Sequence, residues 1–180
     1  MLGYQEIQHV PHDALSVASS LGEFLRARAA GDAQDGQPFY VNCGIGEPHR
    51  PYEREGYDRD DPDTLEVLPY LPDRSGIRED LAGLHGLIWR LDEAVGQMRE
   101  SLEASGLADD TLFIFTTDHG IAFPRMKCTL FDGGIGVSLL LDYPGNPSRA
   151  RAVDALVSQI DLLPTICDLT GIECPEGIQG

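Results

Sequence analysis

Two segments of the chain repeat their apolar residues at the spacing of an amphipathic helix. Across 13–30, apolar side chains recur every three or four positions, which places them on one face of a helix. Segment 81–102 keeps the same spacing for longer and predicts a long helix with one apolar face. Gly31 and Gly106 follow these segments and favour an end to each helix.

Four shorter apolar segments have the composition of β-strands. Residues 39–43 (FYVNC) follow a polar stretch, and 111–117 (TLFIFTT) is the clearest strand pattern in the chain. Segments 136–142 and 153–157 predict two further strands. The sequence then predicts a last helix over 161–171, capped by an aspartate at its start and ended by a glycine.

The order of strand, long helix and strand predicts that 39–43 and 111–117 form a parallel pair. Such connections are right-handed, and strands this apolar lie in sheets that helices cover on both faces. The expected fold class is α/β, a mostly parallel sheet flanked by helices, in one domain spanning 1–180. Segment 46–76 interrupts this pattern with several prolines and an acidic run, which predicts a long functional loop.

The charge balance argues against one class of partner. The 180 residues hold 13 Lys and Arg against 30 Asp and Glu, a formal net charge of −17, which would repel nucleic acid. No apolar run approaches the roughly 20 residues of a membrane span, so no membrane partner is expected. The first residues lack the basic start and apolar core of a signal peptide, and the localisation stays open.

The four cysteines do not have the spacing of a metal site. Cys43, Cys128, Cys167 and Cys174 include no CxxC pair and no zinc-ligand arrangement with histidine. Cys43 lies in a predicted strand and Cys167 in a predicted helix, so we expect buried free thiols. Whether Cys167 and Cys174 can pair depends on geometry that the sequence does not contain.

Charged and titratable side chains gather after two of the predicted strands: His49, Arg50, Asp118, His119, Arg125 and Lys127. In open α/β sheets, ligands bind at the carboxyl ends of strands, so these side chains are expected to face one pocket. Asp118 and His119 offer an oxygen and a nitrogen ligand to a divalent cation, while the basic side chains attract an anion. The combination suits metal-assisted attack on a phosphate or sulfate ester. In the alternative interpretation, Asp118 caps a turn and His119 is a surface histidine.

Three segments, taken in order, resemble the later part of a sulfatase: FYVNCGIGEPHRPY at 39–52, the run from GLIWRLDE to GVSLLL at 86–141, and VSQIDLLPTICDLTGI at 157–172. Within that family they are most similar to the heparan N-sulfatase (sulfamidase) group and its bacterial relatives. The resemblance covers roughly 35–180 and implies an alkaline-phosphatase-like fold. It also implies that the chain is the middle-to-late portion of a sulfatase catalytic domain.

The resemblance assigns roles to the side chains after the strands. It implies that Asp118 and His119 ligate a single calcium ion. It implies that His49 and Lys127 bind the substrate, a sulfated small molecule or sugar, with Arg50 beside the same pocket. Arg125 joins this expected substrate-binding set because its positive charge can attract an anion. Of these, Lys127 binds the sulfate and His49 contacts the sulfate or the leaving group, so both are expected to be catalytic.

The nucleophile of the family does not occur in this sequence. Sulfatases use a formylglycine made from Cys or Ser in a C/S-x-P-x-R motif, with an early pair of metal-binding aspartates, and neither feature is present. The nearest match, around Cys174, lacks the arginine. We therefore expect the formylglycine upstream in the intact enzyme. We also expect the 180-residue chain by itself to be inactive, to bind calcium weakly and to self-associate.

Two other functions remain open from the sequence. A phosphatase, phosphodiesterase or phosphonate hydrolase of the same superfamily would share the fold and an Asp-His metal pair. Two-metal members usually need another histidine ligand further along, and no histidine follows His119 here. The second alternative is a noncatalytic, truncated binding module.

Overall fold

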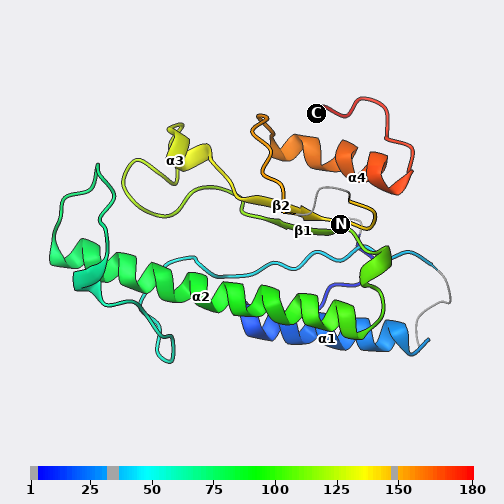
Figure 1. Cartoon of the computed structure of the whole chain (residues 1–180), viewed down its shortest axis with the longest axis horizontal. Coiled ribbons are helices and arrows are strands. Elements are labelled where there is room, and N and C mark those ends of the chain that lie inside the picture. Colours follow the sequence, from blue (N-terminus) through cyan, green and yellow to red (C-terminus); the bar gives the residue numbers. More distant parts are fainter. Residues whose placement is uncertain (1–3, 32–36, 147–149) are drawn as a thin grey trace. The chain divides into compact units, whose positions relative to one another are not determined.

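The computed structural model of the chain describes residues 4–31, 37–146 and 150–180. They form two compact units that divide after Gly145. The first contains helices α1, α2 and α3 and strands β1 and β2, and the second contains helix α4 (Figure 1). Three short 3-10 helices lie between them in the chain, at Pro62–Thr64, Ala108–Asp110 and Gln159–Asp161.

Helix α1 spans Ala14–Ala29, which confirms the helix predicted over 13–30. Asp13 caps it, because its carboxylate accepts a hydrogen bond from the backbone N–H of Ser16 at 3.0 Å. That hydrogen bond lowers the pKa of Asp13 and keeps the cap charged. After the helix, Gly31 has a φ of 81°, a left-handed conformation that glycine adopts without strain.

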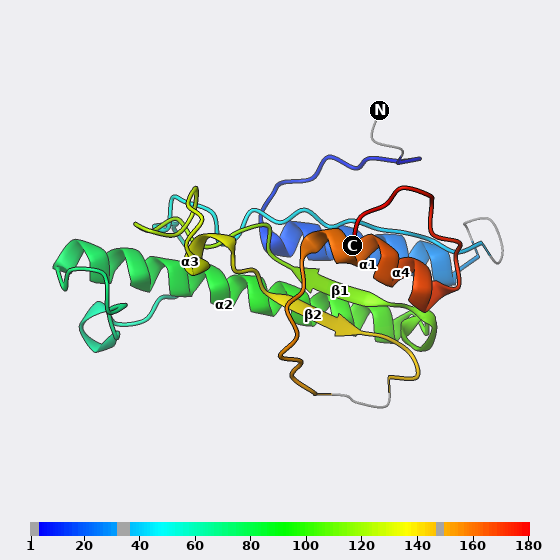
Figure 2. The same cartoon turned by 90° about the horizontal axis from the view of Figure 1, so that it is seen from above.

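Helix α2, Ser75–Ala104, confirms the long helix predicted from the apolar spacing. Its C-terminal half lies along α1, as Figures 1 and 2 both show. Ala94 and Met98 of α2 pack there against Ala18 and its neighbours on α1, all of them buried. Removing this apolar surface from water stabilises the helix pair, because neither helix can bury its apolar face alone.

The sheet has two strands, β1 at Phe113–Thr116 and β2 at Leu139–Asp142, which pair antiparallel. Phe113 lies opposite Asp142 and Thr116 lies opposite Leu139. Asp142 also forms an ion pair of 2.9 Å with Arg99 of α2, which holds the sheet over that helix. Both strands were predicted from their apolar composition.

The parallel sheet expected from the sequence is not present in the described residues, whose one sheet is antiparallel. Segment 39–43 has no strand structure there, and its Tyr40 is 66% exposed. Segment 153–157 is also irregular, and its Leu156 is fully exposed. An apolar run becomes a strand only when another strand supplies hydrogen bonds along its edge, and β1 takes its partner from 139–142 instead.

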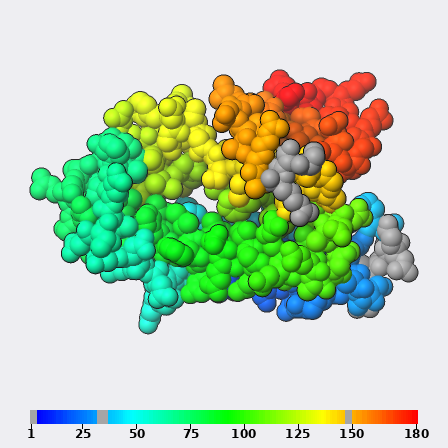
Figure 3. All heavy atoms as spheres, viewed as in Figure 1, coloured from blue at the N-terminus to red at the C-terminus, as the bar shows by residue number. Residues whose placement is uncertain are grey.

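The predicted loop 46–76 is irregular up to residue 74 apart from one 3-10 turn, and its last two residues begin α2, whose N-terminal end the loop covers (Figure 3). Its apolar residues share a second core with α2 and the segment after β1: Tyr52, Leu71, Leu81, Leu84, Leu87 and Phe123. Arg78 of α2 donates hydrogen bonds to the carbonyls of Pro62 and Leu65 at 3.0 and 2.9 Å. These bonds satisfy loop carbonyls that have no sheet or helix partner.

Helix α4, Leu162–Thr170, confirms the last predicted helix and is the main element of the second unit. The predicted cap was wrong, because the Asp161 side chain makes no hydrogen bond to α4 and accepts one from the N–H of Ser158 instead. A capping box precedes it, in which the side chains of Ser158 and Asp161 each accept a backbone hydrogen bond from the other residue. Gly171, with a φ of 70°, ends the helix. No helix in the described ranges is long and apolar enough to cross a membrane.

Two glycines of α2 should respond in opposite directions to the same substitution. A Cβ at Gly86 would collide with the backbone carbonyl oxygen of Asp58, whereas a Cβ at Gly96 would have no atom within 4 Å. We expect Gly86→Ala to lower the free energy of unfolding by about 1–3 kcal/mol, because backbone must move. Gly96→Ala should raise it by up to about 1 kcal/mol, because alanine favours helix. Urea unfolding of both variants tests this, and equal effects would contradict the close contact of loop and helix.

Candidate functional site

The first predicted site residues lie just after β1. Asp118 and His119 adjoin each other, with 3.2 Å between an Asp118 carboxylate oxygen and Nε2 of His119. Nδ1 of His119 lies 2.8 Å from the carbonyl oxygen of Gly120. Because a carbonyl oxygen only accepts hydrogen bonds, Nδ1 carries a proton and donates it. Nε2 is therefore the nitrogen directed toward the carboxylate.

This arrangement favours a positive charge beside Asp118. A neutral His119 protonated at Nδ1 would place the Nε2 lone pair against a carboxylate, and two electron-rich groups at 3.2 Å repel each other. A metal cation held by both side chains would remove the repulsion. The hydrogen bond from Nδ1 to a carbonyl is the usual way in which proteins orient a metal-binding histidine. Among the described residues, no group of three or more His, Cys, Asp or Glu side chains could hold a metal.

The segment that follows His119 is folded tightly through its glycines. The backbone N–H of Gly120 donates to the carbonyl of Gly134, in helix α3 (Asp132–Ile135), at 3.1 Å. A Cβ at Gly120 would overlap the carbonyl oxygen of Gly133, and one at Gly134 would crowd the carbonyl of Thr129. Glycine is required at both positions because backbone approaches backbone.

Lys127 lies in a strained part of this segment. Its backbone N–H donates to the carbonyl of Ile121 at 3.1 Å, closing a compact loop. Arg125 and Cys128, on either side of it, have φ values of 63° and 66°, a left-handed conformation that is uncommon for residues other than glycine. Strained backbone of this kind is concentrated at binding and catalytic sites. The sequence pattern had given no sign of this strain.

Arg125 contacts two aromatic rings and remains exposed. Its guanidinium lies 4.8 Å from the ring centroid of Phe131 and 6.0 Å from that of Tyr70, which belongs to the long loop. Such cation–π contacts orient the guanidinium while leaving its N–H groups available. Arg125 therefore links the long loop to the segment after β1 and can still attract an anion.

His49 lies in a loop anchored by Glu47, a residue that the sequence analysis did not identify. The Glu47 carboxylate is fully buried and accepts three hydrogen bonds, from the N–H of Ala14 at 2.9 Å, from Arg54 at 2.9 Å and from Tyr57 at 2.7 Å. His49 itself is exposed, and its Nδ1 donates to the carbonyl of Arg50 at 2.7 Å. Nε2 of His49 has no partner in the described part of the chain, so it can meet a ligand.

Arg50 connects the His49 loop with the segment after β1. Its guanidinium donates to the Asp80 carboxylate of α2 at 2.6 Å and to the carbonyl of Ala122 at 3.1 Å. It also lies over the ring of Tyr52 at 4.1 Å and near that of Phe123 at 5.3 Å. The hydrogen bond to Asp80 raises the pKa of Arg50, so this side chain stays charged.

The described contacts connect only some of the six predicted residues. Asp118 and His119 contact each other, and Arg50 joins the loop of His49 to the loop of Arg125 and Lys127. Within the described ranges, no hydrogen bond or ion pair connects His49 or Lys127 to the Asp118–His119 pair. The shared pocket predicted from the sequence therefore stays a prediction.

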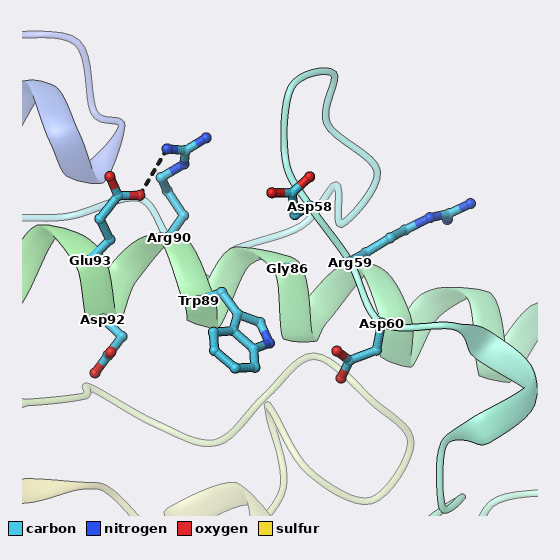
Figure 4. Close-up of a pocket in the computed structure, with 8 residues that line it drawn as sticks. All are labelled: Asp58, Arg59, Asp60, Gly86, Trp89, Arg90, Asp92 and Glu93. Atoms are coloured by element: carbon cyan, nitrogen blue, oxygen red, sulfur yellow. Dashed lines mark hydrogen bonds and ion pairs between the residues drawn. The ribbon is translucent and has the colours of Figure 1, made fainter.

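A hollow of about 390 Å³ lies elsewhere, along α2, and contains none of the six predicted residues. In Figure 4, Trp89 and Asp60 point to one side of α2, and Arg90 and Glu93 form an ion pair on the other. Asp60 accepts from His85 at 2.7 Å, which ties the long loop to the helix. Because its residues come from the loop and from α2 and its side chains diverge, this hollow is best described as the seam between loop and helix.

The contacts of Arg50 predict a larger stability loss than an ordinary surface arginine gives. We expect Arg50→Ala to lower the free energy of unfolding by about 1–2 kcal/mol. The variant loses the hydrogen bond to the carbonyl of Ala122, the contact with the Tyr52 ring and the partly exposed ion pair with Asp80. Arg59→Ala is the matched control, since Arg59 has a half-exposed ion pair with Glu79, and it should cost under about 1 kcal/mol.

Hydrogen exchange measures the second consequence of the same change. The backbone amides of Met126 and Lys127 should exchange faster with solvent in Arg50→Ala, because their hydrogen bonds depend on the loop that Arg50 holds. Their exchange rates should be unchanged in the Arg59→Ala control. Arg50→Lys should recover the ion pair but not the flat contact with Tyr52. Equal unfolding energies and equal exchange for both alanine variants would contradict the connecting role.

Comparison with known proteins places this arrangement in a family. The sulfatase family model matches residues 16–172. N-sulphoglucosamine sulphohydrolase of Homo sapiens is 33% identical over 171 residues, covering 79% of this chain and 33% of its own length. An ulvan-active sulfatase of Formosa agariphila is 32% identical over 162 residues, covering 82% of this chain and 31% of its own length. The chain thus spans about a third of the length of these relatives.

Solved structures agree on the fold. The yidJ protein of Bacteroides fragilis, described as a sulfatase, superposes with a TM-score of 0.80 at 24% identity, covering 92% of this chain and 39% of that one. At this identity the likeness shows the fold alone, which is the alkaline-phosphatase-like fold of sulfatases. With a family model that matches most of its length, the chain belongs to the sulfatase family of hydrolases.

Proposed function

We propose that these residues are the middle-to-late portion of a sulfatase catalytic domain that hydrolyses a sulfate ester or a sulfamate with the help of one calcium ion. The observation that supports this best is the Asp118–His119 pair, which lies just after β1. The Nδ1–H of His119 donates a hydrogen bond to the carbonyl of Gly120, which leaves Nε2 facing Asp118. A cation between the carboxylate and the imidazole would be a ligand partner for both groups. In the alternative interpretation, in which Asp118 and His119 are ordinary surface residues, no such cation is needed.

The donor set fits a calcium ion in part. The Asp118 carboxylate is a hard oxygen ligand and is 85% exposed, so it is free to coordinate. Calcium prefers about six to eight oxygen ligands, so Asp118 and His119 would hold only part of its shell. When bound, the ion would supply positive charge that stabilises the sulfate in the transition state.

The basic side chains divide into two kinds in this proposal. Lys127 and Arg125 present positive charge to the sulfate, and the strained backbone around them sets its direction. With Nδ1 donating to the carbonyl of Arg50, His49 would need a second proton, on Nε2, to donate a hydrogen bond to the sulfate or a proton to the leaving group. The substrate-binding role predicted for Arg50 is less favoured by its contacts, which commit its guanidinium to Asp80 and Ala122.

The attacking group has to come from outside these residues. No C/S-x-P-x-R motif occurs in the sequence, so none of its cysteines matches the precursor of a formylglycine. Cys128, although next to Lys127, has no proline two residues later. A formylglycine upstream in the intact enzyme would supply the nucleophile.

The names of the relatives support a sulfated saccharide as the substrate class, since one acts on N-sulphoglucosamine and another is active on ulvan. A full-length sulfatase containing these residues should release sulfate from N-sulfated or O-sulfated saccharides and from aryl sulfates. Parallel assays with aryl phosphates and phosphodiesters test the alternative within the superfamily. Hydrolysis of phosphate esters without hydrolysis of sulfate esters would reject the proposal.

Lys127 is the single lysine of the chain, which makes its role easy to isolate. In the full-length enzyme, Lys127→Ala should lower kcat/KM for an aryl sulfate by about 100-fold or more, because a charge opposite the reacting anion is lost. The free energy of unfolding, measured by thermal denaturation, should change by less than about 0.5 kcal/mol, as for most surface positions.

Arg151→Ala is the matched control, an exposed cation with no interaction in the described part of the second unit. It should leave both rate and stability unchanged. Equal activity of Lys127→Ala and the control would remove Lys127 from the site.

The 180-residue chain alone should show no aryl-sulfate turnover and only weak calcium binding, because it lacks the nucleophile motif and has two predicted metal ligands. It should also self-associate, since Trp89 and Leu140 are 65% exposed and the two-stranded sheet has unpaired edges among the described residues. An enzyme assay, calcium calorimetry and light scattering measure these three properties separately. Turnover together with micromolar calcium affinity would overturn the expectation.

A further inference from the structure

The loop of His49 contains an arginine to which the proposed sulfatase reaction gives no role. Nη2 of Arg54 donates to the backbone carbonyl of His49 at 3.1 Å. Nη1 of the same guanidinium donates to the Glu47 carboxylate at 2.9 Å, and Nε makes a longer contact of 3.4 Å with the carbonyl of Pro51. One side chain thus contacts the chain before, at and after His49.

The position of Arg54 is set by Glu47, whose carboxylate is fully buried. A buried carboxylate needs a charged partner, and Arg54 is the one with which it forms an ion pair. The carboxylate is itself fixed, because one oxygen accepts from the N–H of Ala14 on α1 at 2.9 Å and the other also accepts from Tyr57 at 2.7 Å. Arg54 therefore connects the backbone of His49 to helix α1.

His49 is held at three of its polar groups. Its N–H donates to the carbonyl of Gly46 at 2.8 Å, and its carbonyl accepts from Arg54. Its Nδ1 donates to the carbonyl of Arg50 at 2.7 Å. The two backbone bonds fix the direction in which the side chain leaves the chain, and the third bond fixes the rotation of the ring. Nε2, the ring nitrogen proposed to meet the sulfate, is therefore held in one place.

We propose that Arg54, held by Glu47, is a positioning residue that fixes the imidazole of His49 against the sulfate ester. The inference rests on the proposed function, which places His49 at the sulfate or the leaving group. A planar guanidinium carries several donors in a fixed geometry, so it can bind a carboxylate and a carbonyl at once. A displacement of about 1 Å at a reacting group can cost about 100-fold in rate, so the orientation of His49 matters for turnover.

The first test uses the 180-residue chain and needs no enzyme activity. In Arg54→Gln, the backbone amide of His49 should exchange with solvent several-fold faster, and the form protonated at Nδ1 should become less populated in nitrogen NMR of the ring. Arg59→Gln is the matched control, because Arg59 lies in the same loop and has an ion pair of 2.9 Å with Glu79. It should leave both measurements unchanged.

A second variant covers the case in which Arg54→Gln does not fold, since it leaves the buried charge of Glu47 without its partner. Glu47→Gln combined with Arg54→Gln removes both charges, and the new amide oxygen can still accept one of the bonds from Ala14 and Tyr57. This double variant should show the same faster exchange at His49.

The second test uses the full-length enzyme and an aryl sulfate. Arg54→Gln should lower kcat about 10-fold and change KM by less than about 2-fold. In a His49→Ala background, the same substitution should lower kcat by less than about 2-fold, because no imidazole remains to be positioned. Arg54→Lys should keep the ion pair with Glu47 and recover stability without recovering kcat, whereas a purely structural role predicts that both recover.

The outcomes separate this proposal from the proposed function. A full-length enzyme that hydrolyses no sulfate ester would reject the proposed function, and exchange and NMR would still test whether Arg54 holds His49. An active enzyme in which Arg54→Gln costs as much in the His49→Ala background as in the wild type would overturn the positioning role alone. Unchanged exchange at His49 in the folded variants of Arg54 would overturn it as well.

Discussion

The guanidinium of Arg50 touches three parts of the first unit at once, and the arrangement of the candidate site depends on it. It reaches Asp80 on α2, the carbonyl of Ala122 after β1, and the ring of Tyr52 in its own loop. Each contact is modest, because the ion pair is partly exposed. Together they fix how the loop of His49 lies against the loop of Lys127. An uncharged side chain at this position would not balance the charge of the Asp80 carboxylate.

A second arginine, which donates hydrogen bonds to backbone carbonyls as well as to a carboxylate, holds the loop 46–76 against α2. Arg78 donates to the carbonyls of Pro62 and Leu65 and to the carboxylate of Asp73. In a chain of net charge −17, the carboxylates of a Pro- and Asp-rich loop need such positive partners to lie against the rest of the fold. The buried residues Tyr52 and Leu71 then add the apolar contacts that the loop could not make in isolation.

The candidate site contains acceptors and positive charges in separate groups. Asp118 and Nε2 of His119 form an electron-rich pair, whereas Arg125 and Lys127 lie in a strained loop a few residues later. A sulfate ester beside a divalent cation needs both groups, one for the metal and one for the anion. This division of charges is the one that the proposed sulfatase reaction would use.

The sequence by itself determined the elements whose cause is local. The spacing of apolar residues predicted α1 and α2, and Asp13 and Gly171 marked a helix start and a helix end, because these features depend on neighbours a few positions away. The adjacent Asp118 and His119 could be predicted as a metal-ligand pair for the same reason, since both possible ligands lie within two residues, and that role stays a prediction.

Only the tertiary structure decided which distant groups meet. The contact of Glu47 with the N–H of Ala14 spans 33 residues, and that of Arg50 with Ala122 spans 72. The antiparallel pairing of β1 with β2 was likewise invisible, because apolar composition marks a strand without naming its partner. The spacing of apolar residues shows which face of a helix or strand is apolar. It carries no information about which other element of the fold packs against that face. A buried carboxylate such as Glu47 is therefore indistinguishable in sequence from a solvated one until its three donors are placed around it.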